Sequence, residues 1–388
     1  MEQSGRIGST YLLGLDGLRA IAISLVILYH FGFDWAPGGR GVVLFFVLSG
    51  FLITRLLLRE HARAGQISIS RFYARRALRI FPAFYCYWLV VVVWLLVNGK
   101  TVPWGHAIAS LAYTTDYFNA ILGDPNTPFS HIWSLAIEEQ FYLLWPILFV
   151  VLIPKPKYLA LTLAGLIGTV WLWRIALTLF TPTQEGYIYA AFDTRVDHIL
   201  VGCLLAILST SGQSSHLVKH LARKTYFPIV TLVLLVLSIF GGDWLGRATG
   251  RQAEYRDVIG FAIEPIIIAV FLIQVVQLGA RSPWSWLEWP PLRLIGRLSY
   301  SLYLYQQLAL WSVASRLAER PPVFQFVVAT AATVLLAAAS YYLVERPFLL
   351  IRNGAGWSLL RVGRRAAPSW SGAARGEVSV PTAPEASG

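Results

Sequence analysis

Two residues in the first apolar segment of the chain have the chemistry and the spacing of a functional pair. Arg19 and His30 lie eleven residues apart in LDGLRAIAISLVILYHFGF. In an α-helix, eleven residues make three turns plus about 20°, which places both side chains on one face, about 16 Å apart along the axis. A guanidinium binds anions, and an imidazole suits general-base catalysis. The alternatives are a topology-setting arginine and an interfacial or capping histidine.

A second basic motif follows in RFYARRALRIFPAFY. On a helix, Arg71, Arg75 and Arg79 share one face, and Arg76 and Arg79 lie about one turn apart. Clustered guanidinium groups suit phosphates, such as those of coenzyme A. A stop-transfer charge cluster at the cytoplasmic surface explains the same residues equally well.

The segment HIWSLAIEEQFYLLWP places a histidine and a carboxylate on one helical face. His131 and Glu138 are seven residues apart, about 10 Å along a helix, and Glu139 points elsewhere. A carboxylate in this position should face the interior of the bundle, where it could orient His30 or bind a sugar hydroxyl. An interfacial glutamate pair among belt aromatics is the alternative.

Two later segments add candidates for substrate binding. In FDTRVDHILVGCLLA, Asp193 and Asp197 lie one turn apart with Arg195 between them. Internal ion pairing there is slightly favoured over a substrate role for Asp197. In GRLSYSLYLYQQ, Ser299 and Tyr303 lie one turn apart and could bind an acceptor or join helices by hydrogen bonds.

Familiar catalytic and metal-binding signatures are missing from the sequence. It contains no Walker A loop, no GxSxG nucleophile elbow and no Cys/His set with zinc-like spacing, so no metal is expected. Ser49, in VLSGFLI, has no neighbouring base in the sequence. A serine nucleophile is therefore not expected.

The elements that must position these residues are long apolar helices. The chain has 388 residues, of which 56% are hydrophobic and 13% charged, which is too apolar for a soluble protein. Windows long and apolar enough to cross a bilayer predict an all-α polytopic membrane protein of about ten helices. They lie at roughly 12–33, 41–58, 80–97, 132–153, 158–180, 192–209, 226–241, 258–279, 295–315 and 323–345.

The net charge of +12 reflects orientation in the membrane. With the N-terminus inside, most of the 32 Lys and Arg residues fall in cytoplasmic connections, which predicts that both termini are cytoplasmic. This charge gives no reason to expect nucleic acid as a partner. The longest external connection, about 98–131, is where an extracytoplasmic substrate would be bound. We expect a membrane domain over residues 1–353 and a disordered cytoplasmic tail over 354–388.

Taken together, the motifs resemble those of the acyltransferase 3 family of bacterial membrane proteins, most of which O-acylate sugars. The resemblance covers almost the whole membrane domain. The segments that carry it, in order, are LDGLRAIAISLVILYHF, GGRGVVLFFVLSGFLITRLL, RRALRIFPAFY, WSLAIEEQFYLLWP, TRVDHILVGCLLA, RLSYSLYLY and LVERPF.

The resemblance implies roles for individual residues. The family's arginine–histidine pair falls on Arg19 and His30, and its basic pair falls on Arg76 and Arg79. Its glutamate and its serine–tyrosine pair fall on Glu138, Ser299 and Tyr303. Many members have a histidine where this chain has Gln306, so the acceptor here could differ. Some members also carry an added extracytoplasmic hydrolase-like domain, which is not expected here.

These expectations define a mechanism in the bacterial inner membrane. Acetyl-CoA or another acyl-CoA, a donor substrate and not a bound cofactor, would dock from the cytoplasm on the arginines. His30 would take the proton of an acceptor hydroxyl, with Glu138 orienting it or the sugar, by direct transfer or through an acylated His30. The acceptor would be a cell-envelope glycan or glycolipid, with polysaccharide-assembly proteins as partners. A macrolide-like acceptor and a transporter or flippase are the alternatives.

Overall fold

The structure is a computed structural model that describes residues 12–181, 185–210, 226–278 and 284–351. Within these ranges the chain forms helices joined by short connections and contains no strand, which confirms the all-α prediction. The predicted tail, residues 354–388, lies outside the described residues.

Each of the ten apolar windows falls on a long helical segment. Among the described residues, eight segments are long and apolar enough to cross a membrane by length and composition. The other two, α10 and α16, are 19 and 27 residues long and carry more polar side chains. The ten segments are α2 (Leu13–His30), α3 (Gly38–Ala64), α4 (Ile69–Val97), α7 (Trp133–Leu152), α8 (Pro156–Phe180), α10 (Phe192–Thr210), α12 (Tyr226–Val236) continued by η3 (Leu237–Gly241) and α13 (Gly242–Thr249), η4 (Tyr255–Gly260) continued by α15 (Phe261–Leu278), α16 (Pro290–Arg316), and α17 (Pro322–Ser340) continued by η7 (Tyr341–Glu345) and α18 (Arg346–Leu350).

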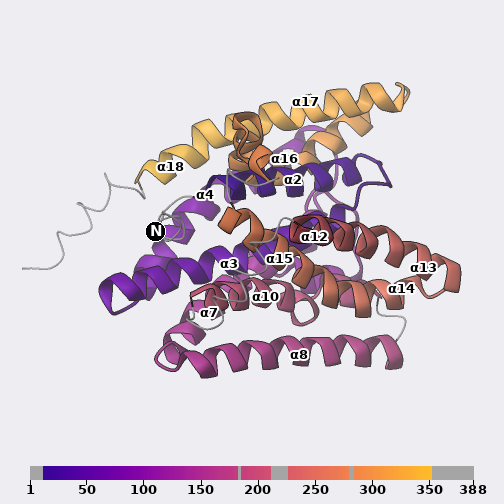
Figure 1. Ribbon diagram of the computed structural model, residues 1–388. Helices are drawn as coiled ribbons and strands as arrows, with labels where there is room; N and C mark the ends of the chain where they lie inside the picture. The colour runs from indigo at the N-terminus through magenta and orange to yellow at the C-terminus, as the bar shows by residue number, and fades with distance from the viewer. Residues whose placement is uncertain (1–11, 182–184, 211–225, 279–283, 352–388) are drawn as a thin grey trace, which may run out of the picture.

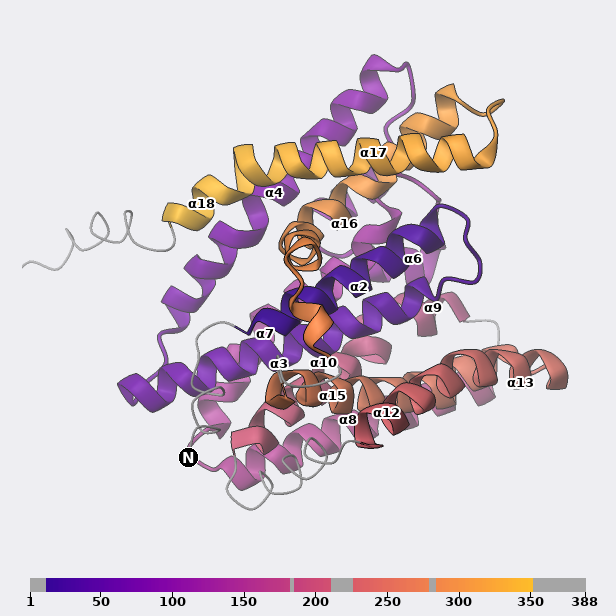
Figure 2. The ribbon, with the colours of Figure 1, turned by 45° about the horizontal axis from the view of Figure 1, so that its top comes forward.

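Most of the long helices run side by side. In Figure 1, α8 lies along one edge, α17 along the opposite edge, and α3 between them. Figure 2 shows α4 running obliquely to the others. Helix α2 packs against both α3 and α16. We name the end of the bundle where α2 begins the proximal end, and the end where α2 finishes at His30 the distal end.

Glycines let the helices that carry the candidate residues approach each other closely. A Cβ atom added at Gly296 of α16 would lie 1.8 Å from the carbonyl oxygen of Asp16 in α2. One added at Gly50 of α3 would lie 1.9 Å from the carbonyl oxygen of Ile199 in α10. In membrane proteins, a small residue at a helix–helix contact lets the two backbones come close together, because no bulky side chain separates them. The first contact brings Ser299 of α16 next to α2.

The long distal connection is more ordered than its Gly, Pro and Asn residues predict. It contains two short helices, α5 (Trp104–Leu111) and α6 (Thr115–Leu122), and a single turn, η2 (Ser130–Ile132). The stretch around residues 123–129, which includes the GDPNTP sequence, is irregular, as are residues 98–103. The ring of His106 in α5 stacks on Phe118 in α6, and its Nδ1 lies 2.8 Å from the Thr127 hydroxyl. Buried aromatic and polar contacts therefore order this connection. The remaining short elements are α9 (Glu185–Ala190), α14 (Gln252–Glu254) and η6 (Ser285–Glu288).

Asp116 in α6 makes the stability of this distal region dependent on pH. The side chain is fully buried, and its Oδ1 accepts a hydrogen bond from Gln140. Burial raises the pKa of Asp116 from 3.8 to about 6. A raised folded-state pKa favours the protonated form, so the free energy of unfolding falls as the pH rises from about 4 to about 6.

We expect Asp116→Asn to remove this penalty. Because asparagine stays neutral and can still accept the hydrogen bond from Gln140, the variant should be more stable at neutral pH by on the order of 2 kcal/mol. Thermal unfolding of the detergent-solubilised protein across this pH range would measure the change. A variant that unfolds at a lower temperature than the wild type at neutral pH would contradict it.

Candidate functional site

The first helix carries the predicted pair on a continuous scaffold. Helix α2 runs without interruption from Leu13 to His30, so Arg19 and His30 are eleven helical rises, about 16 Å, apart. Both side chains are partly buried. Because α2 packs between α3 and α16, those two helices supply neighbours to both residues.

Three guanidinium groups form an arginine cluster (Arg19, Arg76 and Arg79) between α2 and α4. The Nε of Arg19 donates a hydrogen bond to the Ser299 hydroxyl at 3.1 Å. Arg19 and Arg76 each interact electrostatically with Arg79 and with Glu138. Like charges gathered inside a bundle repel one another, so this cluster is suited to binding an anion.

The second basic motif divides between the interior and the surface. The Arg76 guanidinium stacks on the Tyr142 ring of α7, with its central carbon 4.7 Å from the ring centre. Arg75 instead pairs with Glu60 of α3 at 3.2 Å, and Arg71 is exposed. Adjacent arginines therefore have different environments, and Arg76 faces the helices of the bundle.

Glu138 lies at the depth of the arginine cluster and is held by two hydroxyl groups. The Ser49 hydroxyl donates to its Oε1 at 3.0 Å, and the Tyr142 hydroxyl donates to its Oε2 at 3.0 Å. The two hydroxyls are themselves 2.9 Å apart. Among the described residues, no hydrogen bond joins Glu138 to His30. The structure thus places this carboxylate with Arg19 and Arg76, not at the histidine.

The distal end of α2 meets a second set of polar side chains. His30 lies against Gln306 of α16 and interacts electrostatically with His131. Gln306 is fully buried, and His131 is 3% exposed. We call these three residues the distal polar cluster. Its side chains are an amide and two imidazoles, whereas the arginine cluster is cationic.

Ser299 and Tyr303 both join helices. Ser299 of α16 accepts from Arg19 of α2, as described above. The Tyr303 hydroxyl donates to the backbone carbonyl of His131 and lies 2.6 Å from the Ser134 hydroxyl. The rings of Tyr303 and His131 are 5.1 Å apart. The structure therefore shows the helix–helix hydrogen bonds that the sequence left open beside acceptor binding.

Asp197 forms a buried ion pair with a residue of another helix. Its two carboxylate oxygens accept hydrogen bonds from Arg174 of α8 at 2.8 and 2.9 Å, and Trp171 donates a third. Asp197 is fully buried. The local partner suggested by sequence, Arg195, instead has its guanidinium 3.8 Å from the centre of the Phe261 ring. Ion pairing is confirmed, but with a partner 23 residues away in the chain.

Three residues of the site were not singled out as functional by sequence reasoning. Ser49 has no base near it in the chain, and Tyr142 is one of the aromatics that the membrane-belt interpretation of its segment includes. Gln306 drew attention only as a departure from a family pattern. In the sequence, Ser49 stands out only as a hydroxyl residue within an apolar stretch. That pattern does not show that Glu138 is its hydrogen-bond partner. Their contacts depend on helices that are distant in sequence.

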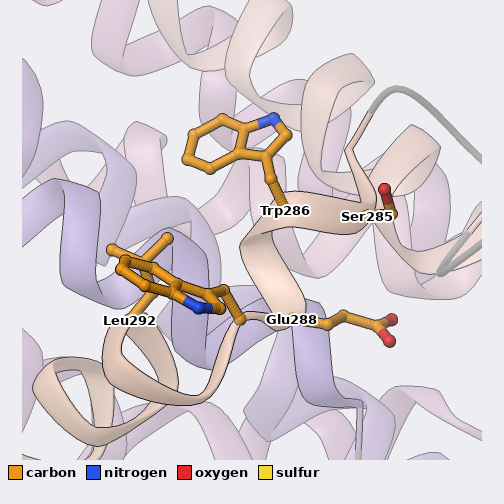
Figure 3. A pocket seen from close by; sticks show the side chains of 5 residues that line it. Ser285, Trp286, Glu288 and Leu292 are labelled. Atoms are coloured by element: carbon orange, nitrogen blue, oxygen red, sulfur yellow. The ribbon is translucent and has the colours of Figure 1, made fainter.

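Two surface hollows formed by described residues lie near the proximal end. The larger, about 640 Å³, is shown in Figure 3, where the Trp286 indole and the Glu288 carboxylate point in different directions. Its tryptophans are typical of a membrane interface. The smaller is about 260 Å³. The larger hollow is lined by Ser285, Trp286, Glu288, Trp289 and Leu292, and the smaller by Leu294, Arg297, Tyr341, Tyr342 and Arg346.

The arrangement divides the candidate chemistry between two places about 16 Å apart along α2. The arginine cluster suits an anionic ligand, and the distal polar cluster offers an imidazole that can accept a proton. Within the described residues, no group of three or more His, Cys, Asp or Glu side chains could hold a metal ion.

Comparison with known proteins gives one family and several relatives. The family model described as "Acyltransferase domain" matches residues 12–342. The chain is 32% identical over 381 residues to "Peptidoglycan O-acetyltransferase OatA" of Listeria monocytogenes, covering 91% of this chain and 58% of that protein. It is 33% identical over 355 residues to "O-acetyltransferase OatA" of Staphylococcus aureus, covering 87% and 57%. The chain thus spans little more than half the length of these relatives. No solved structure matches.

Proposed function

Because the chain belongs to the acyltransferase 3 family, whose domain model matches residues 12–342, we propose that it is a membrane O-acetyltransferase of a cell-envelope glycan. The donor is acetyl-CoA or another acyl-CoA on the cytoplasmic side of the inner membrane. The acceptor is a glycan hydroxyl on the opposite side, and peptidoglycan is the first candidate because the Listeria relative is named for it. Glycan-assembly proteins are the expected partners.

One observation carries this proposal: helix α2 joins an arginine cluster to a partly buried imidazole about 16 Å away. The phosphates of coenzyme A would bind Arg19, Arg76 and Arg79 from the proximal end, which the charge bias of the connections assigns to the cytoplasm. The long arm that carries the thioester would then extend along α2 towards His30. This division explains why the cationic and neutral clusters lie apart.

The contacts around the arginine cluster give its other members supporting roles. Ser299 fixes the direction of the Arg19 side chain through the hydrogen bond to its Nε. Ser49 and Tyr142 hold the Glu138 carboxylate beside the arginines, where it offsets part of their mutual repulsion. Glu138 then acts on the donor end of the site. Tyr303 fixes the backbone at His131 near the acceptor end.

His30 performs the proton transfer in the proposed reaction. One of its ring nitrogens removes the proton from the acceptor hydroxyl as that oxygen bonds to the thioester carbonyl carbon. The bond between carbon and sulfur then breaks, and coenzyme A leaves as a thiolate that takes up a proton. The products are an O-acetyl ester and free coenzyme A. Positioning both substrates in one bundle contributes the remaining acceleration.

The proposal is tested with full-length protein in proteoliposomes. Acetyl-CoA labelled in the acetyl group is supplied on one side and peptidoglycan fragments on the other. We expect label to appear in the glycan as an alkali-labile ester, with one coenzyme A released per ester formed. Solute flux across the vesicle without consumption of acetyl-CoA would contradict the proposal and support a transporter.

We expect Arg76→Gln to weaken donor binding selectively. A hydrogen bond to a charged group contributes about 1.5–3 kcal/mol, so the KM for acetyl-CoA should rise about tenfold or more. Arg75→Gln is the matched control, because the adjacent arginine pairs with Glu60 and should leave this KM unchanged. Initial-rate kinetics at saturating acceptor would measure both values. Equal effects of the two substitutions would remove Arg76 from the donor site.

A further inference from the structure

A hollow at the proximal end of the bundle presents two guanidinium groups and two phenol rings to one small volume. It is the smaller of the two hollows, about 260 Å³, and we call it the basic hollow. Its lining residues are Leu294, Arg297, Tyr341, Tyr342 and Arg346. The side chains of Arg297 and Arg346 are exposed, and no carboxylate among the described residues forms an ion pair with either one. Because two such cations repel each other, the hollow favours an anion.

The local form of the last long helix presents a cation and an aromatic ring together. Residues Tyr341–Glu345 form a π-helical turn, η7, between α17 and α18. Such turns are wider than those of an α-helix and occur frequently at functional sites. The guanidinium of Arg346 lies over the ring of Tyr342, with its central carbon 5.8 Å from the ring centre. This contact orients the guanidinium beside the hollow.

The basic hollow borders the arginine cluster. Arg297 lies two residues before Ser299 on α16, and Ser299 accepts the hydrogen bond from Arg19. Glu345, the neighbour of Arg346 in the chain, interacts electrostatically with Arg19. In addition, η7 packs against α4, the helix that carries the rest of the cluster, and Figure 2 shows the segment from α17 to α18 crossing α4. A ligand bound at the cluster can therefore extend into the hollow.

The chemistry and the size of the hollow identify the part of a ligand that it fits. Guanidinium groups bind phosphate through paired hydrogen bonds, and aromatic side chains stack on purine bases. Pockets for whole small-molecule ligands have volumes of about 300–1,000 Å³, so a hollow of about 260 Å³ fits one end of a larger molecule. In coenzyme A, a diphosphate joins the pantetheine arm to an adenosine that carries a further phosphate on its 3′ oxygen. The adenosine end thus offers both a purine and a phosphate.

We propose that the basic hollow binds the adenosine 3′-phosphate end of the acyl-CoA donor, with Arg297 and Arg346 on the phosphate and the tyrosine rings beside the adenine. The diphosphate then lies at the arginine cluster, and the acyl arm extends along α2 towards His30. The proposal deepens the proposed function and rests on it for the identity of the donor. An anionic lipid headgroup also carries a phosphate, but it has no purine for the tyrosine rings and no second anionic group for the adjacent cluster.

A comparison of coenzyme A with 3′-dephospho-coenzyme A tests this single phosphate. The readout is the unfolding temperature of the full chain in an uncharged detergent during titration of each nucleotide, because a bound ligand raises that temperature by mass action. We expect the wild type to bind coenzyme A about tenfold or more tightly than the dephospho form, because hydrogen bonds between charged groups are strong. In the double variant Arg297→Gln/Arg346→Gln this preference should disappear, while the affinity for the dephospho form should stay the same.

Arg316→Gln is the matched control. It removes another exposed arginine of α16, at the opposite end of the helix, and should keep the full preference for coenzyme A. The side chains replaced in the double variant are exposed, so the ligand-free double variant should unfold at the wild-type temperature. In kinetic assays of the double variant, the KM for acetyl-CoA should rise about tenfold or more, and kcat should stay the same.

Three results would overturn the subsite. The first is equal binding of the two nucleotides to the wild type, a measurement that needs no variant. The second is a preference for coenzyme A that survives in the double variant. The third concerns phosphatidylglycerol added to the micelles. If it stabilised the wild type but not the double variant, and both proteins kept the same preference for coenzyme A, the hollow would be a lipid site.

Failure of the subsite can be distinguished from failure of the proposed function. Equal binding of the two nucleotides, together with transfer of labelled acetyl groups to glycan, would overturn the subsite and leave the proposed function standing. A preference for coenzyme A that is lost in the double variant, together with no transfer to glycan in proteoliposomes, would support the subsite and contradict the proposed function.

Discussion

Replacing His30 with alanine should reduce acetyl transfer to glycan by about 10²–10⁴-fold, the usual contribution of a positioned general base. Coenzyme A should still raise the unfolding temperature of the variant, because the arginine cluster lies about 16 Å away along α2 and keeps its contacts. The loss should therefore appear in kcat and not in the KM for acetyl-CoA. Transfer of label from acetyl-CoA to peptidoglycan fragments in proteoliposomes measures both constants.

His61→Ala is the matched control for this substitution. His61 lies in the last turn of α3, at the proximal end, and is remote from the distal polar cluster. It should keep the wild-type rate. If His30→Ala retained full turnover, His30 would not be the base, and the remaining imidazole of the cluster, His131, would be the next residue to test.

The long helices could be predicted from the sequence because each one satisfies its own backbone hydrogen bonds. A window of apolar residues is enough to define such an element, even at α16, where Ser299, Tyr303 and Gln306 lower the hydropathy. The spacing of Arg19 and His30 could be predicted for the same reason. Only the regularity of α2 is needed to place both side chains on the helix.

The partners of Glu138 could not be predicted, because they depend on contacts between helices. Ser49 is 89 residues away in the chain and meets Glu138 only where α3 and α7 approach each other. The seven-residue spacing of His131 and Glu138 correctly predicts that both lie on one helical segment. The sequence also suggested that the Glu138 carboxylate could orient His30, and the structure shows no hydrogen bond between these two described residues. The direction in which Glu138 points is set by Ser49 and Tyr142. The arginine cluster likewise depends on how α2 and α4 pack.

The polar start of α10 shows the same limit. Its sequence contains Asp193, Arg195 and Asp197 within five residues, and short spacing favours a local ion pair. The structure instead pairs Asp197 with Arg174, because two parallel hydrogen bonds from a guanidinium satisfy both carboxylate oxygens at once. Arg195 is turned onto an aromatic face. Asp197 therefore pairs with the arginine of another helix that can donate to both of its oxygens, and not with the arginine nearest to it in the sequence.

This pair carries the largest expected effect on stability. Arg174 and Asp197 are both almost fully buried, and the guanidinium also donates to the backbone carbonyl of Thr194 at 2.8 Å. Removing one partner of a buried pair leaves an uncompensated charge, which is destabilising by about 3–5 kcal/mol. We therefore expect Arg174→Met to lower the unfolding temperature sharply and to reduce the amount of folded protein recovered in detergent.

The double variant Arg174→Met/Asp197→Leu separates the ion pair from ordinary packing. With both charges gone, no buried carboxylate is left unpaired, so the double variant should be more stable than Arg174→Met alone. Recovery will be partial, because Trp171 and the Thr194 carbonyl each lose a hydrogen-bond partner. Arg251→Met, which breaks the exposed pair with Glu254, is the control and should change stability by at most about 1 kcal/mol. If the double variant were as unstable as the sum of its single changes, the Arg174–Asp197 interaction would not be what stabilises the packing of α8 against α10.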